Sequence, residues 1–228
     1  MIYEFEFGGT TATVIIPEHP NGKWIWKTEF LTAFDKAERD LVDEGYTRVY
    51  YKLSNMYGAP SAIRRMHAFY FEVTKRFSLT EKCVLFGFSR GGLYAFHFAL
   101  AHPDLVAGVY FDAPVLDVRT WPHTDSKEQR ELFDICSLNE ETLVRFRENP
   151  AELLPEYFAL SLPTLLVAGG ADEVVPFPQN AQRMIQEAKA SSFPLISIVK
   201  PDCKHHPHSL EDDTTPILKF VRSLSFER

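Results

Sequence analysis

Cysteine is scarce in this chain, and its few occurrences are not spaced as metal ligands. The 228 residues contain three cysteines, Cys83, Cys136 and Cys203, which lie far apart. An odd number of distant cysteines indicates neither a disulfide framework nor a structural zinc site. We therefore expect reduced thiols in a cytoplasmic protein, with no metal and no cofactor.

Long apolar runs and blocks of charge are missing as well. No stretch approaches the roughly 18 apolar residues that cross a bilayer, and the first 20 residues carry acidic side chains where a secretory signal would be basic. The net charge of −7 is spread along the chain, which predicts no nucleic-acid partner and no membrane partner. We expect a small molecule as the partner, and the sequence leaves the oligomeric state open.

Repeats, low-complexity segments and long linkers are also absent, so residues 1–228 are predicted to form one α/β domain. Short apolar runs alternate with segments of helical period, which predicts a mostly parallel sheet with helices on both faces. The expected hairpin joins residues 3–7 to 11–16. The other expected strands are 23–26, 47–53, 84–86, 105–111, 164–168 and 195–199, and the expected helices are 31–42, 59–77, a helix opening at 91, 178–190 and 216–224.

Residues 112–162 break this alternation. They contain charged helical stretches at 126–136 and 139–147, several prolines and no convincing strand. We interpret the segment as a lid-like insertion over the carboxyl ends of the strands, where reactive groups collect in open α/β sheets.

The most informative motif is Gly87-Phe88-Ser89-Arg90-Gly91. It follows an apolar run and opens a helical segment, which is the strand, turn and helix context of a G-x-S-x-G nucleophile elbow. Such a turn exposes the serine hydroxyl, and the start of the next helix favours a developing oxyanion. The simpler interpretation is a glycine-rich turn whose serine caps the helix.

Two later segments offer the partners that a nucleophilic serine needs. Asp172 follows a buried strand and a glycine turn, in the pattern G-x-x-D-x-x-V-P, and is the predicted acid. Asp112, which ends another strand, ranks second. The base must come from the histidine-rich segment KHHPH at 204–208, which is also a weaker candidate for a metal site.

With these motifs in place, the chain resembles the α/β-hydrolase superfamily over essentially its whole length. More narrowly, it is similar to bacterial serine hydrolases related in fold to the prolyl oligopeptidase and dienelactone hydrolase families. The resemblance rests on WIWKTEF (24–30), YG (57–58), GFSRGGLY (87–94), DAPV (112–115), WP (121–122), ADEVVP (171–176) and HHPHSL (205–210).

The resemblance implies two-step acyl transfer by a Ser89, His205 and Asp172 triad. His205 is preferred as the base because the family histidine directly follows a glycine, although Lys204 replaces that glycine and His206 remains the alternative. The oxyanion donors are expected to be the backbone N–H of Arg90 and that of Trp26 or Lys27.

Substrate specificity is less defined by the sequence. A substrate pocket is predicted to be lined by aromatic and cationic side chains, namely Arg90, Lys27, Trp26, Tyr57 and Trp121, with His206. Alternatively, Arg90 pairs with Asp112 or Glu29 and only braces the loop, and the aromatic residues belong to the core. We expect a serine hydrolase that cleaves a small carboxylic ester. The alternatives are a peptidase or amidase, an acyltransferase on the same residues, and a binding protein without catalysis.

Overall fold

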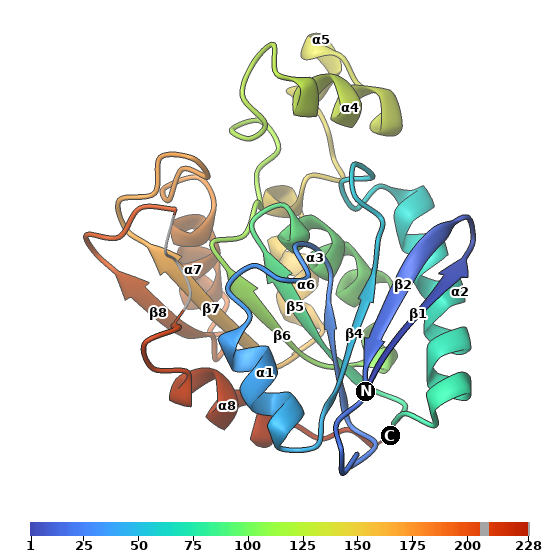
Figure 1. Ribbon diagram of the computed structural model, residues 1–228. Coiled ribbons are helices and arrows are strands. Elements are labelled where there is room, and N and C mark those ends of the chain that lie inside the picture. The colour runs from blue at the N-terminus through green and yellow to red at the C-terminus, as the bar shows by residue number, and fades with distance from the viewer. Residues whose placement is uncertain (206–209, 228) are drawn as a thin grey trace.

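The computed structural model describes residues 1–205 and 210–227, and in these residues eight strands form one sheet (Figure 1). The strand order is β1-β2-β4-β3-β5-β6-β7-β8. At one edge, β2 pairs antiparallel with both β1 and β4. The six strands β3 to β8 are parallel to one another. The strands are β1 (Ile2–Phe7), β2 (Thr10–Ile15), β3 (Trp24–Lys27), β4 (Thr47–Tyr51), β5 (Cys83–Phe88), β6 (Val106–Asp112), β7 (Thr164–Gly169) and β8 (Ile196–Lys200).

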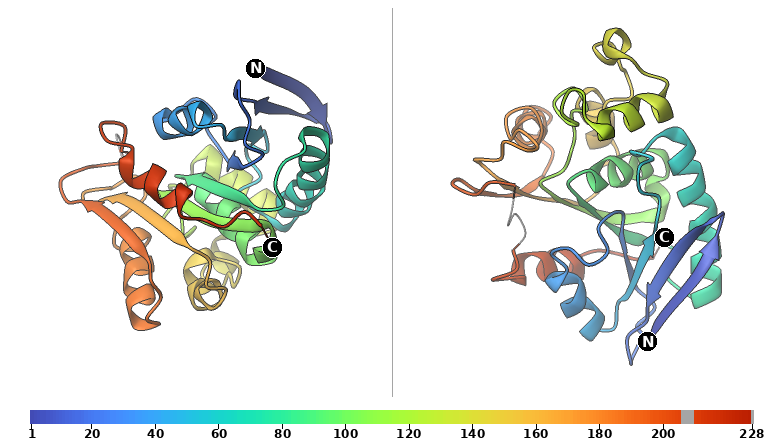
Figure 2. Two further views of the ribbon diagram at one scale, coloured as in Figure 1. Left: turned by 90° about the horizontal axis from the view of Figure 1, so that it is seen from below. Right: turned by 45° about the horizontal axis from the view of Figure 1, so that its top comes forward.

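Helices cover both faces of the sheet, as the view from below shows (Figure 2). The alternating side chains of the buried strands separate two cores. Phe86 and Val167 face α1 and α8, whereas Leu85 and Leu166 face α2, α3, α6 and α7. The helices are α1 (Lys36–Asp43), α2 (Pro60–Phe77), α3 (Gly91–Ala101), α4 (Lys127–Cys136), α5 (Glu140–Leu143), α6 (Leu154–Ala159), α7 (Ala181–Ala190) and α8 (Thr215–Arg222).

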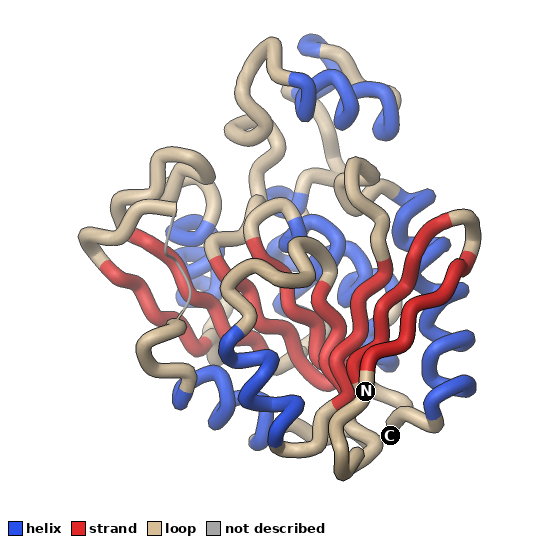
Figure 3. Tube along the Cα trace, in the orientation of Figure 1, coloured by secondary structure: helices blue, strands red, loops and turns tan. Residues whose placement is uncertain are grey.

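The predicted helix at 31–42 is wrong in its first turns. Leu31 and Phe34 have helical spacing, but the structure places them in a loop, and α1 begins at Lys36 (Figure 3). Phe30 and Phe34 have φ angles of 57° and 50°, which no right-handed helix contains. Arg48 of β4 holds this loop open, because its guanidinium donates to the Leu31 carbonyl and pairs with Asp35.

The segment between β6 and β7, residues 113–163, is the insertion. Its helices α4 and α5 stand at the top of Figure 1, beyond the carboxyl ends of the strands. Ser126 caps α4 by accepting from the Gln129 N–H at 3.0 Å. The predicted helix at 139–147 is shorter in the structure, where α5 has four residues.

No helix in the described ranges combines the length and the apolarity that a membrane crossing needs.

Candidate active site

Ser89 lies at the turn between β5 and α3, in a backbone conformation that non-glycine residues rarely adopt. Its φ is 49°. The turn is fixed from the neighbouring strand: the Ser89 N–H donates to the Asp112 carbonyl at 3.0 Å, and the Ser89 carbonyl accepts from the Val115 N–H at 2.9 Å. These hydrogen bonds hold Ser89 in its strained backbone conformation, as a nucleophile elbow requires.

Gly87 explains why α3 can follow the strand so closely. A Cβ at this position would lie 2.8 Å from the Ala95 Cβ and 3.1 Å from the Gly92 Cα. Any larger residue would push α3 away from β5 and would move the hydroxyl of Ser89 with it.

His205 joins Ser89 to Asp172 through two hydrogen bonds. The His205 Nε2 lies 3.1 Å from the Ser89 Oγ, and the His205 Nδ1 lies 2.7 Å from the Asp172 Oδ2. The other carboxylate oxygen of Asp172 accepts from the N–H groups of Val174 and Val175, each at 3.0 Å. The side chains of His205 and Asp172 are only 5 % and 3 % exposed, so water competes little for these bonds.

The loops that carry the acid and the histidine are held together at Gly169. A Cβ there would lie 2.4 Å from the Cys203 carbonyl oxygen and 2.5 Å from that of Lys204. The Ala171 N–H also donates to the Cys203 carbonyl at 2.9 Å. The glycine at the end of β7 thus allows the close contact that brings Asp172 to His205.

Asp112, the second candidate for the acid, is occupied elsewhere. Its carboxylate is fully buried and accepts a hydrogen bond from the Tyr110 hydroxyl, while the contact of His205 is with Asp172. Burial raises the pKa of Asp112 to about 7. His206, the alternative base, lies outside the described residues. Within the described ranges, no three His, Cys, Asp or Glu side chains are grouped to hold a metal ion.

The prediction that Trp26 or Lys27 supplies an oxyanion donor is wrong. Both residues lie inside β3, which pairs with β4 on one side and β5 on the other, so the sheet uses their N–H groups. The Trp26 ring stacks on Trp24 in the core, and the buried Lys27 ammonium pairs with Glu38 at 2.5 Å.

Three other N–H groups, which directly follow β3 or Ser89 in the chain, lie outside the sheet ladder. The sheet ladder continues to Thr28, whose N–H donates to the Phe86 carbonyl at 3.1 Å. In the described part of the chain, the N–H groups of Glu29, Phe30 and Arg90 have no acceptor. The nitrogen of Glu29 lies 3.4 Å from where a Cβ of Gly91 would be, beside the first turn of α3.

The side chain of Arg90 braces the site. Its Nε and Nη2 donate to the Glu29 Oε2 at 3.1 and 3.0 Å, and Glu29 is 1 % exposed. This confirms one of the two pairings that the sequence left open. The neighbouring charge of Glu29 raises the pKa of Arg90 against the opposing effect of burial.

The predicted pocket residues Tyr57 and Trp121 lie together, with ring centroids 6.2 Å apart. The Tyr57 hydroxyl donates to the Glu131 Oε2 at 2.6 Å, which connects this loop to α4 of the insertion. Burial, with the nearby carboxylate, raises the pKa of Tyr57. Glu131 was not predicted, because a charged residue on a surface helix has the pattern of a solvated face.

Tyr94 is another residue whose role the sequence does not signal, because its spacing on α3 is that of a core side chain. Its hydroxyl accepts from the N–H groups of Met56 and Tyr57 at 2.9 and 2.8 Å and donates to the Leu53 carbonyl at 2.6 Å. These bonds fix the loop that carries Tyr57, whose φ is 49°.

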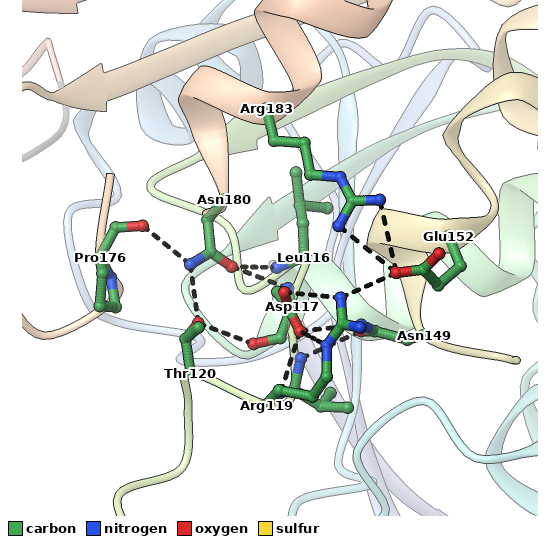
Figure 4. A network of polar contacts seen from close by, with 10 residues as sticks. Leu116, Asp117, Arg119, Thr120, Asn149, Glu152, Pro176, Asn180 and Arg183 are labelled. Atoms are coloured by element: carbon green, nitrogen blue, oxygen red, sulfur yellow. Dashed lines mark hydrogen bonds and ion pairs between the residues drawn. The ribbon is translucent and has the colours of Figure 1, made fainter. Parts of the chain in front are cut away.

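A polar network, which we call the base clamp, ties both ends of the insertion to the acid loop, the loop that carries Asp172 (Figure 4). It consists of Asp117, Arg119, Asn149, Glu152 and Asn180. The Asn180 Oδ1 accepts from the N–H groups of Leu116 and Asp117 at 2.8 Å, and its Nδ2 donates to the Pro176 carbonyl at 2.9 Å.

The other clamp residues join the two ends of the insertion to each other. The Asn149 Nδ2 donates to Asp117 at 2.8 Å, and Arg119 bridges Asp117 and Glu152 at 2.8 Å each. The insertion and the loop that carries Asp172 therefore form one connected unit.

The sheet order and the strained serine at the turn between β5 and α3 are those of the α/β-hydrolase fold, and His205 and Asp172 are hydrogen-bonded in sequence to that serine. The model of the prolyl oligopeptidase family matches residues 63–225, which include Ser89, Asp172 and His205. The chain belongs to this family and is a serine hydrolase of the α/β-hydrolase superfamily. No curated protein matches it in sequence.

Solved structures of low sequence identity share the fold. Dipeptidyl peptidase 4 of Porphyromonas gingivalis matches with a TM-score of 0.69 and 14 % identity over 97 % of this chain and 34 % of its own. The serine hydrolase FphF of Staphylococcus aureus gives 0.75 and 16 %, covering 97 % of both chains. S-formylglutathione hydrolase of the same organism gives 0.70 and 16 %, covering 97 % and 95 %. The chain thus spans about a third of the peptidase's length.

Proposed function

We propose that this protein hydrolyses a small carboxylic ester through an acyl-enzyme on Ser89. The observation that carries the proposal is the pair of hydrogen bonds from Asp172 to His205 and from His205 to Ser89, at 2.7 and 3.1 Å. A serine hydroxyl becomes a useful nucleophile when an oriented imidazole accepts its proton, and this geometry supports that transfer.

The reaction proceeds in two steps. The Ser89 Oγ attacks the ester carbonyl while its proton passes to the His205 Nε2, and the tetrahedral intermediate then expels the alcohol, which takes the proton from His205. In the second step, His205 removes a proton from water as the water oxygen attacks the acyl-enzyme. The second tetrahedral intermediate then expels the Ser89 Oγ, which takes the proton back from His205, and the carboxylic acid is released. Asp172 holds the proton on Nδ1 and stabilises the imidazolium in both steps.

The negative oxygen of each intermediate needs donors at the elbow. We assign the Arg90 N–H as one donor and the N–H of Glu29, or of Phe30 directly after it, as the other. Arg90 directly precedes α3, the Glu29 nitrogen lies beside its first turn, and none of the three N–H groups has an acceptor in the described ranges. The ion pair of Arg90 with Glu29 connects the two donor segments and so preorganises them.

An ester is favoured over an amide because an alcohol leaves with less proton assistance than an amine does. The structural neighbours include a peptidase as well as a serine hydrolase and an S-formylglutathione hydrolase, so amide cleavage is the second candidate, and an acyltransferase would use the same residues. A small-molecule ester as partner and a cytoplasmic location belong to the same proposal, and the three free cysteines support the location.

The test is labelling with a fluorophosphonate, which phosphonylates an activated serine with loss of fluoride, followed by turnover of p-nitrophenyl esters and anilides. We expect wild type to be labelled and to cleave esters, and Ser89→Ala and His205→Ala to lose both properties while keeping the fold. Matched controls are the exposed Ser225→Ala and His123→Ala. Full labelling of Ser89→Ala would refute the serine mechanism, and faster cleavage of anilides would favour the amidase.

A further inference from the structure

A cavity away from the elbow lies between α2, α3 and the insertion. Its volume is about 430 Å³, within the range of small-molecule sites. Ser89 precedes the first residue of α3, whereas the cavity is lined from the other half of that helix, from His97 to His102. An 11-residue helix is about 16 Å long, so the two sites are at opposite ends of α3.

Two histidines from different helices stack at this cavity. The rings of His67, on α2, and His102, at the end of α3, are 3.9 Å apart and inclined by only 5°. Each ring also contacts an aromatic side chain of its own helix, Phe71 and Phe98 respectively. Each imidazole of the stack is therefore also packed against an aromatic ring.

His97 adds a third imidazole to the lining. The His97 side chain is half-buried, and among the described residues its ring nitrogens have no hydrogen-bond partner, so they are accessible to a ligand. Burial lowers the pKa of His97 to about 4, so at neutral pH the ring is uncharged and offers one donor and one acceptor.

The rim and the walls define the charge and the size of a ligand. Arg64 is exposed at the rim and forms no ion pair with any described residue, and the one acidic lining residue, Glu148, is exposed as well. The walls between them are mostly apolar and include Ile63, Leu100 and Leu153. A cation at the mouth, imidazole donors and an apolar interior suit a small anion with an apolar body.

We propose that this cavity binds a short-chain carboxylate. The carboxylate group lies near Arg64 and the imidazoles, and the alkyl chain lies against Ile63, Leu100 and Leu153. The proposal does not rest on the catalytic function, because none of the side chains that line the cavity has a proposed catalytic role.

The test is an NMR titration of the full-length wild type with hexanoate at neutral pH, in which the ring Cε1–H signals of the eight histidines are monitored. We expect the signals of His67, His97 and His102 to shift along one saturation curve, and those of His19 and His123 to stay fixed. Hexanamide, the uncharged analogue of similar size, is expected to give much smaller shifts.

Variants separate recognition from accidental contact. Arg64→Gln is expected to weaken hexanoate binding about threefold to fivefold, which is the range of a partly exposed charge contact. Lys75→Gln, which removes an exposed charge on the same helix, is the matched control and is expected to leave binding unchanged. His97→Phe keeps the ring but removes both nitrogens, and it is expected to reduce the preference for hexanoate over hexanamide.

Three outcomes would overturn the proposal: no shift of these signals up to about 50 mM hexanoate, equal shifts with hexanamide, or unchanged affinity in Arg64→Gln. A shift confined to His205 would mean that the carboxylate enters the elbow instead and would also overturn it. Because Arg64 is exposed, its substitution keeps the test decisive even if His97→Phe fails to fold.

Discussion

Replacing Asp172 by asparagine tests whether the aspartate sets the proton position on His205. The amide oxygen of asparagine can still accept from the N–H groups of Val174 and Val175, as the Asp172 Oδ1 does at 3.0 Å. The amide nitrogen then faces the His205 Nδ1 and donates to it. The ring proton must move to Nε2, which faces the Ser89 Oγ at 3.1 Å and can no longer accept the serine proton.

This change is expected to lower kcat/KM by about 10³- to 10⁴-fold, equivalent to about 4 to 5.5 kcal/mol of transition-state stabilisation. The free energy of unfolding is expected to change by no more than about 1 to 2 kcal/mol, because the backbone donors stay satisfied. The assay combines hydrolysis of p-nitrophenyl acetate, the rate of fluorophosphonate labelling and thermal unfolding.

Asp112→Asn is the matched control, since Asp112 is equally buried, ends the neighbouring strand β6 and makes its contact with Tyr110. We expect its kcat/KM to stay within a few-fold of wild type. The reasoning would be refuted if Asp172→Asn retained more than a tenth of the wild-type value, or if Asp112→Asn lost as much activity as Asp172→Asn.

Three further predictions follow from the described geometry. Gly169→Ala places a Cβ 2.4 Å from the Cys203 carbonyl oxygen in the loop before His205. It is expected to lower the free energy of unfolding by about 1 to 3 kcal/mol and to lower kcat, and an unchanged melting temperature would contradict this prediction. Glu29→Gln weakens a buried pair with Arg90 and is expected to lower the urea-derived unfolding free energy by about 1 to 2 kcal/mol, whereas Glu72→Gln, in an exposed pair, should change it by less than about 0.5 kcal/mol. Burial raises the pKa of Asp112 to about 7, so the folded state binds more protons than the unfolded state between pH 3.8 and about 7, and wild-type stability should fall with rising pH in this window relative to Asp112→Asn. Parallel urea curves of the two proteins across that window would contradict this last prediction.

The parts of the fold that could be predicted are those whose signals are contiguous. The apolar run of β5, the glycine before Ser89 and the helical period after it lie within 20 residues, and the structure has the strand, turn and helix there. The first turns before α1 could not be predicted in this way. The apolar spacing of Leu31 and Phe34 is helical, but Arg48, from a strand further along the chain, fixes this segment as a loop.

The site shows the same division. Ser89, Asp172 and His205 could be selected because each follows a recognisable strand, and the structure brings the three together. The second oxyanion donor could not, because its prediction as Trp26 or Lys27 depended on the residue at which β3 ends. Lys27 belongs to the strand, and its buried charge is balanced by Glu38, a pairing that no local pattern indicates.

The contact between the insertion and the acid loop constrains how this protein can be recombined with its relatives. Asn180 binds the backbone at Leu116 and Asp117, and Asn149 and Glu152 close the same network from the other end of the insertion. A graft that exchanges the whole segment between β6 and β7 would remove acceptors and donors on which the aspartate loop depends. Crossover points inside residues 121–148 would leave that loop intact. Helices α4 and α5 can then be exchanged, while all base clamp residues stay together in the recipient protein.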